Sequence, residues 1–186
     1  MAVLHPVEIQ NFYIKSASFF QFSRSCRSPF IFFDTKFPGC IFRASKHHRQ
    51  LSLAKHYFVL KFNADDIRPI LVSLTVSDGG TSTATLQFKL RDFDLRCHSH
   101  ALGSIALLKS SGINLTRNQQ LGIPSTWLAH LLLDAGLVGD FSKATCYDFA
   151  ILFKALFQLT TKTWVRLSKT MEEFMALKKC FWWSHL

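Results

Sequence analysis

Phe30–Gly39 reads FIFFDTKFPG, and this stretch decides the fold class of the chain. Four apolar residues run directly into Asp34, and a short run of aromatic and branched side chains predicts a central strand that is buried on both faces. A Pro-Gly turn signal follows at once. Because side chains two positions apart on a strand share a face, Asp34 and Lys36 are expected to point the same way. Two carboxylates placed so would form a divalent-cation site, but the second position holds a lysine.

The composition is that of a folded protein. At 186 residues the chain has the length of one domain and can bury a sizeable core. Its 48% hydrophobic and 18% charged residues exclude a disordered tail. No apolar run approaches the roughly 18 residues of a membrane span, and the N-terminus lacks a signal-peptide pattern. The five cysteines are odd in number and never spaced as Cys-x-x-Cys, which favours reduced intracellular thiols.

The net charge of +10 favours an acidic partner, with nucleic acid first among the classes. The plainer alternative is a basic protein that binds nothing anionic. Within the sequence, the basic run Lys46–Arg49 could contact phosphate or could form a solvated loop. Residues 9–33 contain no acid but several serines, so an organellar transit peptide is a further alternative for this segment.

Strand patterns dominate the first half of the chain. Residues 70–91 alternate apolar and polar side chains around the turn Asp78-Gly79-Gly80, which predicts a hairpin with an exposed loop through Thr85. The N-terminal segment, residues 1–27, is predicted to be helical. Its phenylalanines favour core packing, with a partner surface as the alternative: Phe12, Phe19, Phe20 and Phe22.

Helical patterns dominate the second half. Ser104 and Ser125 are each expected to cap a helix that ends at a glycine. A third helix is expected to begin near Asp148, where apolar residues follow at the spacing of a core-facing stripe. A last amphipathic helix is expected through residues 172–180. Strands first and helices afterwards, around one sheet, indicate an α/β or α+β fold with helices packed on a mixed sheet.

Two acids are candidate cation ligands. Asp34 ends a strand and Asp148 starts a helix, and hard cations such as Mg²⁺ prefer carboxylate oxygens at such places. The structural alternatives for each acid are an N-cap, a turn or an ion pair. His98 and His100 could share a strand face and bind a transition metal, but a solvated pair in a polar loop is favoured.

Several motifs in a fixed order carry a resemblance to one family. The chain resembles the Caf1/Pop2 deadenylases over residues 28 to 175, and the number of separate motifs makes the resemblance specific. The matching segments are Pro29–Gly39 followed by Phe42-Arg43, Leu74–Asp78, Phe88–Asp94, Ser104–Leu108, Gly112-Ile113, Asn118, Gly122-Ile123, Gly136–Val138, and Tyr147–Phe149 with Leu152 and Lys154.

The resemblance implies an RNase H-like fold of the DEDD exonuclease group, here as one domain over residues 28–186 that is expected to be truncated at its C-terminus. It implies 3′-to-5′ removal of poly(A) from mRNA, in cytoplasm and nucleus, on a scaffold subunit of the Ccr4–Not complex. In such sites four carboxylates hold two Mg²⁺ or Mn²⁺ ions that activate water and stabilise the leaving oxygen. Carried over by position, Asp34 is the first acid and Asp148 the third.

The chain departs from the family pattern at the positions of the acidic metal ligands. Lys36 stands where the family has its second acid, and the motif that supplies the fourth acid has no counterpart before Leu186. The terminal Phe181–Leu186 matches nothing in the family. We therefore expect weak binding of catalytic metal and slow or absent poly(A) shortening. Two alternatives stay open: a non-catalytic relative that binds RNA or Ccr4–Not partners, and the product of a decaying gene copy.

Overall fold

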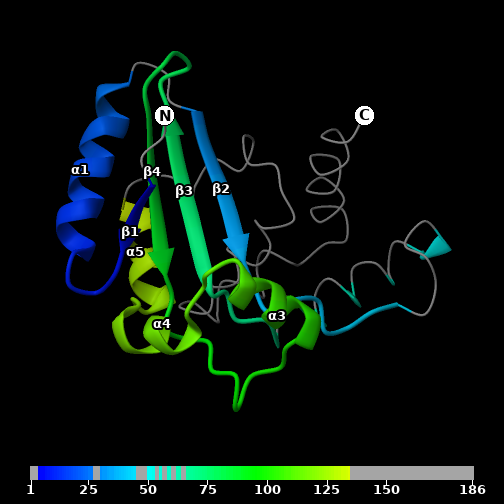
Figure 1. The fold of residues 1–186 in the computed structure, drawn as a ribbon. Coiled ribbons are helices and arrows are strands. Elements are labelled where there is room, and N and C mark those ends of the chain that lie inside the picture. Colours follow the sequence, from blue (N-terminus) through cyan, green and yellow to red (C-terminus); the bar gives the residue numbers. More distant parts are fainter. Residues whose placement is uncertain are drawn as a thin grey trace.

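The computed structural model describes residues 4–26, 30–44, 50–52, 55, 58–59, 62–63 and 66–134. In chain order the named elements are β1 (Leu4–Val7), α1 (Phe12–Ser25), β2 (Phe30–Lys36), β3 (Leu71–Ser77), β4 (Thr83–Lys89), α3 (Leu102–Ser110), α4 (Leu115–Leu121) and α5 (Ser125–Asp134) (Figure 1). The described residues between 55 and 66, apart from these elements, are also helical. The expected helices near Asp148 and through residues 172–180 lie outside the described residues.

The strands form one mixed sheet in the order β1-β4-β3-β2. Strand β1 runs parallel to β4, whereas the pairs β2–β3 and β3–β4 are antiparallel. The predicted hairpin is confirmed, because β3 and β4 pair along their whole length from Leu71↔Lys89 to Ser77↔Thr83. The predicted loop through Thr85 is too long: β4 begins at Thr83, and the Thr85 hydroxyl lies 2.9 Å from the Thr75 hydroxyl across the strands.

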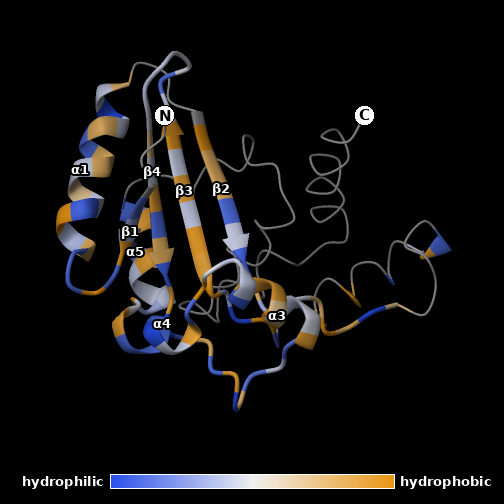
Figure 2. Cartoon of the chain, viewed as in Figure 1, coloured by the Kyte–Doolittle hydropathy of each residue, from blue (hydrophilic) through white to orange (hydrophobic). Residues whose placement is uncertain are grey.

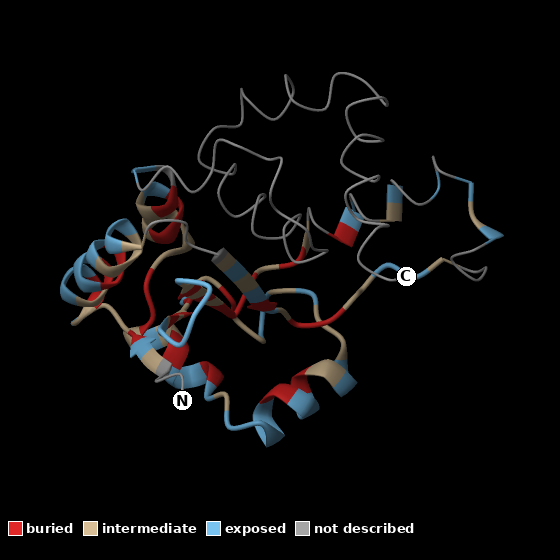
Figure 3. Cartoon of the chain, turned by 90° about the horizontal axis from the view of Figure 1, so that it is seen from above, coloured by how far each residue is buried: buried red, intermediate tan, exposed pale blue. Residues whose placement is uncertain are grey.

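One face of the sheet is covered by α1 and α5. Buried side chains from β1, β3 and β4 meet buried side chains of both helices in a single cluster. Figure 3 shows the buried residues gathered between helices and strands, with exposed residues on the outer sides of the helices. Core packing of the N-terminal phenylalanines is confirmed, since Phe12, Phe19 and Phe20 are buried and Phe22 packs against the cluster.

Strand β1 was not predicted. It is short and contains a proline, which lacks the N–H that a strand interior needs. Its place at the edge of the described sheet accounts for that tolerance, because Pro6 lies opposite Gln87 of β4 alone. With β1 in the sheet and α1 packed on it, the N-terminal residues belong to the same core as the later strands.

The prediction that β2 is buried on both faces is wrong. Within the described part of the chain, β2 pairs with β3 and ends the sheet on that side. Ile31 and Phe33 point to the core beneath α1 and α5, but Phe32 is 58% exposed on the opposite face. An apolar run is enough to specify a strand, but which faces are covered depends on elements distant in sequence.

Helix starts differ from the predicted caps. Helix α3 begins at Leu102, so Ser104 lies inside it, and the N-cap position belongs to Ala101, which makes no side-chain cap bond. The Ala101 N–H donates to the Pro38 carbonyl at 2.9 Å, and this tertiary bond accompanies the earlier start. Ser125 is the first residue of α5, and its N–H donates to Asp92 Oδ2 at 2.6 Å.

Helix α4 was also missed. Its N-cap is Asn114, whose side-chain oxygen accepts the N–H of Arg117 at 2.9 Å, so the cap was readable from the sequence. The buried Asn118 donates from its amide to the Ile70 carbonyl and joins this helix to the start of β3. None of the helices in the part of the chain that the structure describes is long and apolar enough to cross a bilayer.

Candidate functional site

Asp34 and Lys36 lie side by side on the face of β2 that points away from α1 and α5. The alternation of the strand puts both side chains on this face, as predicted, with side chains about half exposed. The Lys36 ammonium lies 2.8 Å from Asp34 Oδ2 and 3.1 Å from Oδ1. One cation therefore contacts both oxygens of the carboxylate, and of the three structural alternatives for Asp34 the structure shows the ion pair.

The chain that follows Lys36 is held firmly in place. The Lys36 carbonyl accepts the N–H of Ile70 at 2.8 Å, which fixes the end of β2 against the start of β3. Gly39 has a φ of +94°, in the left-handed region, and a Cβ there would collide with the side chains of Ser104 and Ala101. The glycine thus allows the turn after β2 to pack directly on α3, and the strand exit has a defined geometry.

The carboxylate of Asp34 is already paired with a cation. No group of three or more potential metal-ligand side chains occurs among the described residues. Asp34 is a single carboxylate whose two oxygens already contact an ammonium. A metal ion that used either oxygen would lie next to a positive charge, and a +2/+1 pair about 4 Å apart repels by about 2 kcal/mol in water and about 8 kcal/mol at an effective dielectric of 20.

The other predicted ligand, Asp148, lies outside the described residues, so its distance from Asp34 is not defined. The same holds for Lys46–Arg49. The two acids after β4 have structural contacts. Asp92 caps α5, as described above, and Asp94 accepts from the Arg96 side chain at 2.8 and 3.2 Å. Hydrogen bonds from Arg96 hold the pKa of Asp94 well below its ordinary value.

His98 and His100 form hydrogen bonds within the loop after β4. His98 Nδ1 accepts the N–H of Asp94 at 2.9 Å, and His100 Nδ1 lies 2.9 Å from the His98 carbonyl, to which it donates. Both rings also contact Phe93, with ring centroids 6.0 and 6.3 Å away. Each histidine therefore has a structural partner on one ring nitrogen and a packed ring.

A cluster of three charged residues joins β1, β4 and α4. Glu8 is largely buried, and its Oε1 lies 2.6 Å from Lys89 Nζ and 3.2 Å from Arg117 Nε. Hydrogen bonds from Arg117 and then from Lys89 lower the pKa of Glu8. Sequence patterns gave no sign of this cluster, because its members are 81 and 109 positions from Glu8. Because the cluster joins β1, β4 and α4 at the edge of the sheet, its role is structural.

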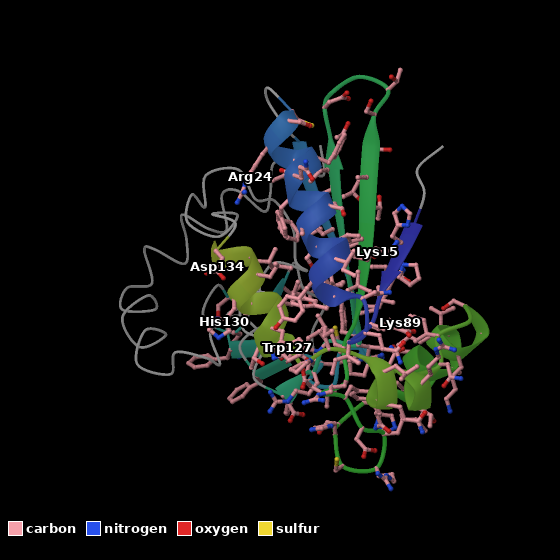
Figure 4. The ribbon with its side chains drawn as sticks, turned by 90° about the vertical axis from the view of Figure 1, so that its left-hand side faces the viewer. Lys15, Arg24, Lys89, Trp127, His130 and Asp134 are labelled. Atoms are coloured by element: carbon pink, nitrogen blue, oxygen red, sulfur yellow. The ribbon has the colours of Figure 1, made fainter. Side chains whose placement is uncertain are left out.

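A hollow of about 540 Å³ lies between α1 and α5, on the opposite side of the sheet from Asp34. Arg24 and Asp134, both labelled in Figure 4, line it together with apolar side chains of the two helices. The Ser16 hydroxyl is buried there without a hydrogen-bond partner. The hollow combines one cation with one anion, brings no set of catalytic groups together, and is distinct from the Asp34–Lys36 site.

An exposed aromatic cluster after β2 was missed by sequence reasoning. Phe42, Phe58 and Phe62 are 43%, 52% and 51% exposed, and the ring of Phe62 contacts the rings of the other two. The available signal was the i, i+4 spacing of Phe58 and Phe62 among basic residues. Figure 2 shows both apolar and polar residues in the parts of this segment that the structure describes.

The chain is similar to CCR4-associated factor 1 homologs of a plant and to poly(A) ribonucleases of fungi. It is 34% identical over 142 residues to a probable CCR4-associated factor 1 homolog 7 of Arabidopsis thaliana, covering 69% of this chain and 51% of that protein. It is 34% identical over 142 residues to the poly(A) ribonuclease pop2 of Schizosaccharomyces pombe, covering 72% and 42%. The chain thus spans about half, or less, of the length of these relatives. No family model matches the chain.

The fold of the chain is similar to solved structures of the same kind of protein. The structure of S. pombe Pop2p in its Mg²⁺- and Mn²⁺-bound form matches with a TM-score of 0.74 and 30% identity, over 96% of this chain and 70% of that chain. CAF1 in a crystal with the yeast NOT1 MIF4G domain is a further neighbour, with a TM-score of 0.61 and 25% identity, over 84% and 59%. The predicted RNase H-like fold is confirmed, and the chain belongs to the Caf1/Pop2 deadenylase family.

Proposed function

We propose that this chain is a divergent poly(A)-specific 3′-to-5′ exoribonuclease whose metal-dependent hydrolysis is impaired. The family assignment supports the substrate class and the reaction, and the S. pombe relative is described with Mg²⁺ and Mn²⁺ bound. The single observation that supports the impairment is the distance of 2.8 Å between the Lys36 ammonium and Asp34 Oδ2. By the resemblance, these two residues stand at the positions of the first and second acids of the family. Cytoplasm and nucleus are the compartments this function implies.

The residues have distinct proposed roles. Asp34 and Asp148 are the carboxylates that would hold divalent ions, and those ions supply an activated water and charge stabilisation when bound. Lys36 opposes this in two ways: it neutralises the charge of Asp34, and it repels any second cation nearby. A barrier raised by several kcal/mol lowers a rate by orders of magnitude, since about 1.4 kcal/mol is tenfold.

The test is a shortening assay on 5′-labelled oligo(A) with Mn²⁺ or Mg²⁺, run beside the S. pombe relative. We expect a rate at least about 30-fold lower than that of the relative, corresponding to the lower repulsion of about 2 kcal/mol. Asp34→Ala should abolish whatever activity is left, and a chelator should do the same. Laddering at the rate of the relative, lost on Asp34→Ala, would refute the impairment.

A second candidate function is binding without cleavage. The neighbour solved with the NOT1 MIF4G domain supports a Ccr4–Not scaffold subunit as partner. Capture of purified NOT1 MIF4G domain by a chain that does not shorten oligo(A) would favour this function. Absence of capture by a chain with a cooperative thermal transition would count against it, and absence of any such transition would indicate a product that does not fold.

A further inference from the structure

The exposed phenylalanine cluster has a geometry that suits unpaired bases. The ring of Phe62 lies between the other two, with its centroid 5.7 Å from that of Phe42 and 6.4 Å from that of Phe58. The Phe58 and Phe62 planes differ by 27°, so the two rings are nearly parallel, and each side chain is about half exposed. Base–aromatic stacking tolerates any base sequence, because every base has a π-face.

A buried side chain holds the cluster together. Asn63 is 2% exposed and accepts from the N–H groups of Ile41 and Phe42 at 2.8 and 3.0 Å. Its amide donates to the carbonyls of Phe42 and Val59 at 2.8 and 2.9 Å. Three of these bonds tie the extended segment after β2 to Asn63, and the fourth ties Asn63 to Val59, four positions earlier. The relative position of the rings is therefore built into the fold.

The charge of the segment identifies the partner class. Between Asp34 and Asp65 the sequence contains six lysines and arginines and no acid. Lys55 is exposed and precedes Phe58 by three positions in the sequence. Arg43 is exposed next to Phe42. Aromatic rings with cations beside them are the composition of surfaces that bind single-stranded nucleic acid.

We infer that Phe42, Phe58 and Phe62 form a stacking surface for single-stranded RNA, separate from the Asp34–Lys36 site. The cluster begins six residues after Lys36, a span of at most about 20 Å for extended chain. One RNA strand can thus contact both places. The inference rests on the proposed function for the identity of the RNA as poly(A), but binding through the rings needs neither metal nor hydrolysis.

The experiment measures binding of 5′-labelled oligo(A) by fluorescence anisotropy in the presence of a chelator. In the full chain, the double variant Phe58→Ala, Phe62→Ala should bind at least about fivefold more weakly for each ring that stacks on a base. The matched control is Tyr13→Ala, Ile14→Ala, which removes two apolar side chains of α1 that are 72% and 73% exposed. It should bind as the parent chain does.

Two further variants separate stacking from charge. Phe58→Tyr keeps a ring and should keep the affinity to within about twofold. Lys55→Ala should lower the slope of log Kd against log salt by about 0.7, whereas the phenylalanine variant should leave that slope unchanged. If the double variant melts early, Phe58→Ala alone, which leaves the Asn63 bonds in place, replaces it in the same comparison.

Unchanged affinity of a folded phenylalanine variant would overturn the inference, as would an equal loss in the Tyr13 and Ile14 control. Sedimentation adds a third opposing result: a parent chain that dimerises, with a monomeric phenylalanine variant, would show that the rings contact a second copy. The proposed function is tested separately. Shortening at the family rate would overturn that proposal alone, because the binding assay contains no metal.

Discussion

Replacing Lys36 should restore affinity for a divalent ion in proportion to the charge removed. The ammonium contacts both oxygens of Asp34, at 2.8 and 3.1 Å, so an ion on this carboxylate would lie within about 4 Å of the positive charge. The side chains are 45% and 52% exposed, which favours the water-like end of the range, about 2 kcal/mol of repulsion. Lys36→Gln should therefore tighten Mn²⁺ binding by about 30-fold.

Lys36→Glu changes the charge by two units and should tighten binding further, by about 1,000-fold relative to the parent, from about 4 kcal/mol. The assay is titration of Mn²⁺ into each purified protein by calorimetry. Folding stability should change by less than about 1 kcal/mol in either variant, since the pair is exposed.

The result that would refute this reasoning is equal Mn²⁺ affinity in the parent and both variants. It would mean that the lysine swings away without cost, or that the metal does not use Asp34. Asp34→Ala in the parent chain distinguishes these two explanations, because it should weaken Mn²⁺ binding only if Asp34 is a ligand.

Three further changes test the structure around the site. Arg117 and Lys89 lower the pKa of Glu8 from its ordinary 4.5, so the stabilisation by Glu8 is present above that value and is lost as the pH falls through the lower folded pKa. Glu8→Gln should lower the free energy of unfolding by about 1–2 kcal/mol at pH 7. In thermal melts from pH 7 to 3, the melting temperature of this variant should fall less steeply with pH than that of the parent chain. A slope equal to that of the parent would show that the cluster does not titrate with folding. Gly39→Ala should lower the unfolding free energy by about 2–4 kcal/mol in urea titrations, from a strained φ and a collision with α3; a loss below 0.5 kcal/mol would show that the turn adjusts freely. Asn63→Leu should cost about 1–3 kcal/mol and speed hydrogen exchange at the amides it caps, and unchanged exchange there would contradict the bonds described.

Local patterns predicted the elements whose signals are local. The hairpin of β3 and β4 and the strand β2 follow from alternation and from a turn signal, and each lies within three residues of its predicted bounds. The shared face of Asp34 and Lys36 follows from the same two-residue period. For these features nothing distant in the sequence had to be known.

Local sequence patterns did not predict the features that depend on residues distant in the sequence. Strand β1 becomes a strand by pairing with β4, some 80 positions later, and its four residues carry no pattern of their own. The start of α3 is accompanied by the Ala101 bond to Pro38, and α5 starts on Asp92, not on a serine side chain. The exposure of Phe32 depends likewise on which face the helices cover.

The candidate site was half predictable. The two-residue spacing of Asp34 and Lys36 predicted that their side chains lie together. The family resemblance added that the lysine stands at the position of an acidic ligand. The Phe42–Phe58–Phe62 cluster was not predicted, because Phe42 joins the other two only through the hydrogen bonds of Asn63, 21 positions away. A composition of rings and cations marked the segment, but not its shape.

Crystals of the chain soaked in Mn²⁺ give the most direct measurement. An anomalous difference map should show no strong peak within bonding distance of the Asp34 carboxylate, with the Lys36 ammonium still about 3 Å from it. Two well-occupied ions beside Asp34, with the lysine turned away, would contradict the account.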